Sequence, residues 1–289
     1  MRKLKFSKIW YVVALLLLCN GVVFAAAKEG EFHNYLTLDF FDIGQGDSIY
    51  FRTPEGNDVL IDGGPTDAVL SKLGDVMPFF DRKIELVIAT HPHADHISGL
   101  IEVFKRYKVD MVLMPDVEYD SDTYREFLDL LKEKNIALAH PVLGARILLD
   151  SETVLDILYP LNPKFEKPPA DLNDVSIVGR LSFGTSNILF TGDAGKDIEK
   201  IFLDLNLPIT AEILKVGHHG SKHSSSSDFL EKVNPDFAVI SVGKNSYGHP
   251  SQETLVSLEA EKIETLRTDK HGDVKFLVYP SEVVLSDSK

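Results

Sequence analysis

Short apolar runs of strand length alternate along this chain with segments in which apolar residues recur at helical spacing. The pattern predicts strands over residues 35–41, 47–51, 58–62, 84–90, 110–114, 146–150, 153–159, 175–183, 187–191, 212–216, 236–241, 265–268, 274–279 and 282–286. It predicts helices over residues 67–80, 97–107, 121–134, 195–204, 226–233 and 251–262. Mixed hairpins and β–α alternation indicate a layered α/β fold, with two sheets between outer helices as one option.

The first 27 residues follow a different plan. Four basic residues (Arg2, Lys3, Lys5 and Lys8) precede an apolar run at 9–24, and three alanines follow at 25–27. This order is typical of a secretory signal peptide. We therefore predict a signal peptide over 1–27, a single domain over 28–289, and export to the periplasm or the cell exterior. An uncleaved N-terminal anchor is the alternative, because the apolar run is nearly long enough to span a membrane.

Without this leader the chain is strongly acidic. The sequence has 30 Lys and Arg against 44 Asp and Glu, and the leader holds four of the basic residues and no acidic one, which leaves 26 against 44, or −18. Such a surface repels polyanions, so a nucleic-acid substrate would need a strongly positive group, such as metal ions, to capture its phosphate. The only cysteine, Cys19, lies in the leader, so the mature chain has no thiolate nucleophile or ligand.

The segment VIATHPHADHISG (87–99) places His91, His93, Asp95 and His96 directly after a predicted buried strand. Imidazole and carboxylate hold divalent metals where no thiolate is available. On a tight turn, the first two histidines can point one way and Asp95 and His96 another, which suits two ions a few Å apart and hydrolytic chemistry. A polar loop with incidental histidines is the alternative.

Three later segments add candidates of the same chemistry. In ILFTGDAG (188–195), Asp193 follows a strand and could bridge two ions, although a plain Gly-Asp turn would also explain it. In LKVGHHGSKHSS (214–225), His218 could be a metal ligand and His219 a phosphate-facing acid or donor. In GKNSYGHPSQETL (243–255), His249 is a candidate ligand, because the capping loop around it does not itself need a histidine.

Taken in order, these motifs resemble the metallo-β-lactamase superfamily. With FFDIGQGDSIYF, VLIDGG, NDVS and GHP, the chain more closely resembles the extracellular hydrolase domain of ComEC-type DNA-uptake competence proteins, over residues 38–258. The His-x-His-x-Asp-His motif alone specifies only the superfamily, and GQGDS with GHHGS and GHP narrows the match. The resemblance implies a four-layer αββα sandwich with metals at one edge between the sheets.

The resemblance also implies two divalent ions, zinc or manganese. The first ion would be held by His91 and His93. Many superfamily members add a further histidine there, but NDVS (173–176) occupies that region here, so His218 is the expected substitute. The other expected ligands are Asp95, His96 and His249 for the second ion and Asp193 as the bridge. Asp62 would orient the metal-binding loop, and Asp47 would lie near the rim of the site.

We therefore expect a metal-dependent hydrolase, most directly a phosphodiesterase or nuclease, in which the ions activate a bound water and neutralise the phosphate. Asp95 and His219 are the expected catalytic residues, and His219 or a second water would protonate the leaving oxygen. The expected substrate is single-stranded DNA or a smaller phosphodiester, and the smaller one is favoured because no basic track for a DNA backbone is present. No further apolar run of spanning length follows the leader, so we expect the hydrolase without the channel of the competence proteins.

Two other functional classes stay open. A lactamase or lactonase would use the same ions on a carboxylic ester or amide. A non-enzymatic surface binding protein would require a broken metal site, and all of the expected ligands except the uncertain one at the first ion are present.

Overall fold

The computed structural model describes residues 33–165, 167 and 169–286, together with four helical residues of the leader, Tyr11, Val13, Leu15 and Leu18. Residues 1–33 and 34–289 form separate compact units. Apart from those four residues, the predicted signal peptide lies outside the described part of the chain, and so does Cys19. None of the helices among the described residues is long and apolar enough to cross a membrane.

Residues 34–289 build two mixed sheets. The strands are β1 Leu36–Phe40, β2 Ile49–Arg52, β3 Asp58–Ile61, β4 Lys83–Ile88, β5 Lys108–Leu113, β6 Ala137–Ala139, β7 Arg146–Leu148, β8 Thr153–Tyr159, β9 Val178–Phe183, β10 Ser186–Phe190, β11 Ile213–Lys215, β12 Phe237–Ile240, β13 Glu264–Arg267, β14 Val274–Tyr279 and β15 Glu282–Ser286. One sheet has the order β15-β14-β1-β2-β3-β4-β5-β6, and the other β13-β12-β11-β10-β9-β8-β7. In each sheet a run of parallel strands, β3 to β6 and β10 to β13, supplies the ends on which the site is built.

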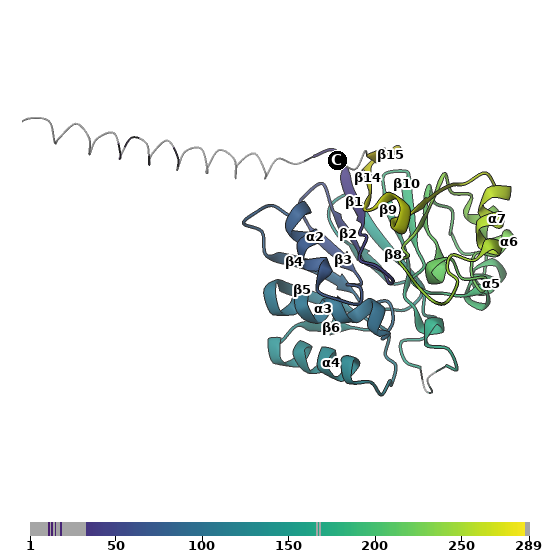
Figure 1. Ribbon diagram of the computed structural model, residues 1–289, viewed down its shortest axis with the longest axis horizontal. Helices are drawn as coiled ribbons and strands as arrows, with labels where there is room; N and C mark the ends of the chain where they lie inside the picture. The colour runs from purple at the N-terminus through teal and green to yellow at the C-terminus, as the bar shows by residue number, and fades with distance from the viewer. Residues whose placement is uncertain are drawn as a thin grey trace, which may run out of the picture. The chain divides into compact units, whose positions relative to one another are not determined.

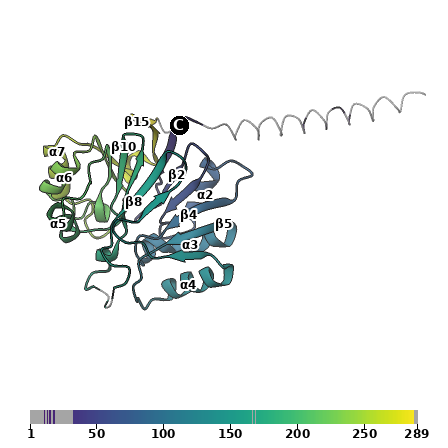
Figure 2. The ribbon, with the colours of Figure 1, turned by 180° about the vertical axis from the view of Figure 1, so that it is seen from behind.

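Helices cover the outer face of each sheet (Figures 1 and 2). They are α2 Ala68–Val76, α3 Ala94–Arg106, α4 Asp122–Lys134, α5 Lys196–Asp204, α6 Ser227–Val233, α7 Gln252–Ala260 and α8 Thr268–His271, with the 3-10 turns η1 Leu172–Val175 and η2 Gly217–Gly220. Helices α2, α3 and α4 lie beside the first sheet, and α5, α6 and α7 beside the second (Figure 1). The predicted four-layer αββα sandwich is therefore confirmed.

Three apolar cores hold these layers together. The central core lies between the sheets, where Phe51 of β2 stacks on Phe190 of β10 at a ring distance of 6.1 Å. The other two fill the space between each sheet and its own helices, around Phe104 and Phe127 on one side and Phe202 and Phe229 on the other. Burial of apolar surface on both faces of each sheet explains why many strands read as near-continuous apolar runs.

Helix α3 begins earlier than the sequence pattern predicted. The expected start was residue 97, whereas the helix begins at Ala94 with His93 at the N-cap position, so Asp95 lies in the first turn. A carboxylate is favourable there because the first turn has free N–H groups and a positive dipole end. Gly99 allows this helix to approach the loop after β3, since a Cβ at that position would lie 1.9 Å from the Gly63 carbonyl oxygen.

Candidate metal centre

The predicted site residues follow the ends of parallel strands in both sheets. His91 follows β4, Asp193 follows β10, His218 and His219 lie in η2 directly after β11, and His249 lies in the loop between β12 and α7. Parallel strands place their carboxyl ends at the same edge of a sheet, and ligands bind at that edge in layered α/β folds. The fold thus brings residues more than a hundred positions apart to one edge.

Atoms able to ligate a metal converge here in four overlapping groups, each within 4.8 Å. The groups are His91, His96 and Asp193; Asp95, His96 and His219; Asp47, Asp62 and His96; and Asp47, Asp193 and His219. The Nε2 of His96 lies 3.4 Å from Asp193 Oδ2 and 3.9 Å from Asp95 Oδ2, and the Nε2 of His219 lies 3.5 Å and 3.6 Å from the same two oxygens. Two imidazoles therefore face one pair of carboxylates.

A buried carboxylate fixes the orientation of His96. Asp62 Oδ2 accepts hydrogen bonds from His96 Nδ1 at 2.8 Å and from the Thr90 hydroxyl at 2.6 Å, and its Oδ1 accepts from the Thr90 N–H at 2.8 Å. Because Nδ1 of His96 donates to a carboxylate, its Nε2 is left to face the cluster. A carboxylate behind a ligating histidine fixes its tautomer and ring orientation in metal sites.

The backbone of η2 orients His219 toward the carboxylates, as Asp62 orients His96. His218 and His219 both have left-handed backbone, with φ of 47° and 52°, and this conformation costs about 1–2 kcal/mol for a residue with a side chain. Such strain is typical of functional sites. Nδ1 of His219 donates to the Ser241 carbonyl at 2.8 Å, so Nε2 faces the carboxylates.

A buried lysine that the sequence analysis did not single out lies beneath the cluster. Lys215 is fully buried, its Nζ pairs with Asp47 Oδ2, and it donates to the Gly192 carbonyl at 2.9 Å. The same Nζ is 3.8 Å from Asp193 Oδ1. The sequence signal for this buried residue is a lysine within the otherwise apolar run ILKV (213–216), because lysine is almost never fully buried without a partner.

The carboxylates set the protonation of the two central imidazoles. Burial alone would lower the pKa of His219, but Asp193, Asp47 and Asp95 outweigh it and raise that pKa to about 9. Burial is likewise outweighed at His96, where Asp193 and Asp62 hold the pKa well above its usual value. Both imidazoles are therefore protonated on both ring nitrogens and positively charged at neutral pH in the metal-free protein.

The outer histidines have the opposite tendency. Burial, and then the neighbouring His96, hold the pKa of His91 well below its usual value. Burial lowers the pKa of His218 and of His249, and each has another histidine as a further unfavourable neighbour. These imidazoles are neutral at neutral pH, which is the form that binds metals or donates a hydrogen bond without bearing charge.

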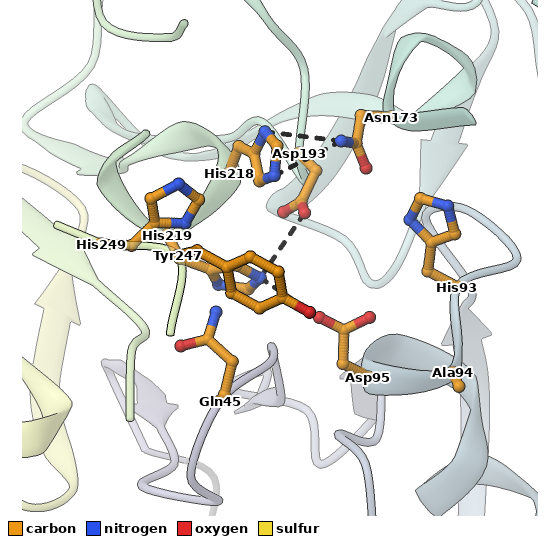
Figure 3. Close-up of a pocket in the computed structure, with 10 residues that line it drawn as sticks. All are labelled: Gln45, His93, Ala94, Asp95, Asn173, Asp193, His218, His219, Tyr247 and His249. Carbon is orange, nitrogen blue, oxygen red and sulfur yellow. Dashed lines mark hydrogen bonds and ion pairs between the residues drawn. The ribbon is translucent and has the colours of Figure 1, made fainter. Parts of the chain in front are cut away.

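An open pocket of about 330 Å³ gives access to the cluster. In Figure 3, Asp193 and Asp95 point toward the same space, with His93 on one side and His218, His219 and His249 on the other. Asn173 of η1 closes the pocket near His218, with its Nδ2 3.4 Å from both ring nitrogens of that histidine. The remaining lining residues are Gln45, Ala94 and Tyr247.

The structure thus brings all the sequence-predicted residues to one place, in two sets. The ligand groups contain His91, Asp95, His96, Asp193 and the expected acid His219, with Asp47 and Asp62 behind them. His93, His218 and His249 line the same pocket outside those groups, and His93 Nδ1 lies 3.0 Å from His91 Nε2. Asp47 is buried rather than on the rim where it was expected, because it pairs with Lys215. The sequence did not identify Lys215, Asn173 or Tyr247 as residues of the site.

The chemistry of these atoms fits a divalent cation. His96 Nε2, His219 Nε2, Asp193 Oδ1 and Asp47 Oδ1 are buried and have no hydrogen-bond partner among the described residues. Buried polar atoms are nearly always paired. Buried imidazole nitrogens and carboxylate oxygens that lack hydrogen bonds and have only ion-pair contacts of 3.4–3.9 Å are donors that suit a divalent metal of the zinc or manganese type.

The chain is similar to known competence proteins in sequence and to a solved metalloenzyme in fold. ComE operon protein 3 of Bacillus subtilis (strain 168) is 32% identical over 86% of this chain, and competence protein ComA of Neisseria gonorrhoeae is 27% identical over 91%. The chain covers 33% and 35% of those two proteins, so it spans about a third of their length. Among solved structures, CmlA, a diiron β-hydroxylase from Streptomyces venezuelae, matches 84% of this chain and 54% of its own with a TM-score of 0.54 and 13% identity, which shows a shared fold.

A family model described as the metallo-beta-lactamase superfamily matches residues 41–244. That range runs from the end of β1 to the loop after β12 and includes the His-x-His-x-Asp-His turn, Asp193 and the η2 histidines. The chain belongs to the metallo-β-lactamase superfamily.

Proposed function

We propose that this protein is an exported, metal-dependent phosphodiesterase that is related to the competence proteins. One observation carries the proposal: His96 and His219 face Asp95 and Asp193 at 3.4–3.9 Å, at the base of a pocket open to solvent. The superfamily membership and the buried donor set support a hydrolase with divalent metal.

The donor geometry supports a revised set of ligands for the second ion. We expect Asp95, His96 and His219 to hold it, because their ligand atoms lie within 4.8 Å of one another. His91 and His93 would contribute to the first ion, and Asp193, which is close to both sets, would bridge. Bound there, the ions would supply a hydroxide near neutral pH and offset the charge of the phosphate.

The remaining residues of the pocket would orient the substrate. His218 and His249 are neutral at neutral pH, so either can donate a ring N–H to a phosphate oxygen. If His219 is a ligand, it is not free to protonate the leaving oxygen, and water in the open pocket becomes the expected donor. This assigns substrate orientation to His249, and also to His218, which was the expected substitute ligand of the first ion.

Two further features support the choice of substrate and compartment. The relatives named above are described as competence or com operon proteins, which supports a phosphodiester of nucleic acid. The basic head, apolar run and alanines of residues 1–27 support export.

The decisive experiment measures turnover by the purified chain after it is stripped and reloaded with manganese or zinc. The substrates are bis-p-nitrophenyl phosphate and a single-stranded DNA oligonucleotide, and the double variant His91→Ala/Asp193→Ala is the control. We expect metal-dependent turnover that the control loses. Metal binding without turnover of either substrate would contradict the proposal and favour hydrolysis of a carboxylic ester or lactam.

A further inference from the structure

A groove of about 800 Å³ continues from the metal pocket along one side of the site. The groove and the pocket share Gln45, Ala94, Asp95 and Tyr247. The pocket has a volume of about 330 Å³ and the groove about 800 Å³. A small phosphodiester bound in the pocket would therefore leave the groove open. A longer substrate could occupy both.

The loop at residues 243–249, part of which lines this groove, is braced by the side chain of Asn245. Asn245 Oδ1 accepts hydrogen bonds from the N–H groups of residues 247, 248 and 249 at 3.0–3.1 Å. Its Nδ2 donates to the carbonyls of Gly243 and His249 at 2.9 and 2.8 Å. The Gly243 N–H donates to Gln45 Oε1 at 3.3 Å, which ties this loop to the opposite wall.

This bracing fixes the backbone of the loop that carries an aromatic ring, Tyr247, and a cation, Lys244, at the groove. The Tyr247 side chain is 74% exposed although its backbone is fixed. Lys244 is exposed and makes no salt bridge with any described residue. The Tyr247 ring lies 5.9 Å from the His249 ring, centroid to centroid, and an aromatic side chain on a fixed backbone loses less conformational freedom when a planar group stacks on it. Bases of single strands stack on such rings, and lysines beside them track the phosphates.

We infer that the groove binds the nucleotide that flanks the scissile phosphodiester of a single-stranded polynucleotide, with its base on Tyr247 and its phosphate at Lys244. This rests on the proposed function and adds a subsite and two specificity-determining residues to it. A paired base has no free face for the ring, so the subsite selects single strands over duplex. Lys244 also supplies one positive charge for the phosphate, in an acidic chain that has no continuous basic track for a nucleic-acid backbone.

The test separates base stacking from phosphate binding. Fluorescence anisotropy and KM are measured for a single-stranded oligo-dT and for an abasic oligonucleotide of the same length, with the metal-loaded full chain. We expect Tyr247→Ala to weaken binding of oligo-dT about tenfold relative to the abasic strand, while Tyr247→Phe keeps the wild-type ratio. Phe79→Ala is the matched control, because Phe79 is also 74% exposed and lines neither cavity.

Lys244→Gln should weaken both strands equally and make the dependence of log K on log salt shallower by about 0.7. If Tyr247→Ala leaves the ratio between oligo-dT and the abasic strand unchanged, the inference is wrong even where turnover is observed. If the chain hydrolyses neither strand nor bis-p-nitrophenyl phosphate, the proposed function fails, and the anisotropy ratio still decides the subsite.

Discussion

Lys215 and Asp47 form an ion pair in which both side chains are buried, directly beneath the candidate ligands Asp193 and His219. The lysine offsets the burial of Asp47 and holds the pKa of that carboxyl below its usual value. Its hydrogen bond to the Gly192 carbonyl also braces the turn that carries Asp193.

Removal of the lysine should therefore destabilise the protein. We expect Lys215→Met to lower the free energy of unfolding of the metal-free protein by about 3–5 kcal/mol, because the buried Asp47 loses its shortest charged contact and keeps only the longer ones to His219 and His96. The measurement is urea denaturation followed by circular dichroism. Lys215→Met/Asp47→Leu, which removes both charges, should recover much of the loss. A single variant that loses less than about 1 kcal/mol, as an exposed pair would, contradicts this account.

We expect Asp62 to support metal binding by orienting His96, without being a ligand itself. Asp62→Asn replaces the carboxylate that accepts the His96 Nδ1–H, so His96 loses its fixed tautomer. We expect metal affinity to fall about 10–100-fold, as for other residues behind a ligating histidine. Competition with a chromogenic chelator measures this affinity. Asp75→Asn removes an exposed carboxylate outside the ligand groups and serves as control. Equal affinities for the two variants would disprove the role of Asp62.

His219 and His249 should behave differently when they are replaced. His219→Ala removes a nitrogen that lies 3.5 Å from Asp193 and 3.6 Å from Asp95, so we expect bound metal to fall by about one equivalent. His249→Ala should keep the full metal content and lower turnover, because His249 lines the pocket outside the ligand groups. Metal analysis after gel filtration gives the stoichiometry. Loss of metal from the His249 variant alone would restore the ligand set that the family resemblance implied.

Metal affinity should rise with pH across the neutral range. The pKa of His219 in the metal-free protein is raised to about 9, so its proton must leave before Nε2 can bind a metal. Up to that pH, the apparent Kd should fall about tenfold for each unit by which the pH rises, for each proton that the metal displaces. The same raised pKa stabilises the metal-free fold fully below the unfolded value of 6.5, and this contribution is lost as the pH rises through about 9.

Chelator competition at pH 6.5, 7.5 and 8.5 measures the slope, and calorimetry in two buffers counts the protons released. His219→Gln should make the slope shallower by about one proton, because glutamine carries no proton to displace while the proton of His96 still has to leave. A Kd that does not change with pH in the wild-type protein would show that His219 is neutral before the metal binds.

The amino-acid sequence by itself determined the layered α/β fold and the location of the site. Its apolar periodicity indicated strands and helices, and the His-x-His-x-Asp-His turn lay just after a buried strand, where ligands collect. Local spacing carried this information because strand and helix periods, and residues a few positions apart, are set by backbone geometry. The start of α3 at Ala94 was missed, because helix ends are set by capping contacts more than by apolar spacing.

Only the tertiary structure decided which histidine faces which carboxylate. His219 and His249 are separated by a helix and a strand in the sequence, and either could have reached Asp95. The left-handed backbone at η2 and the Ser241 carbonyl place His219 there. The partner of Lys215 was equally hidden, because Asp47 lies 168 positions earlier, in the loop between two strands of the other sheet. Contacts between sheets depend on how the two layers pack, and no local pattern encodes them.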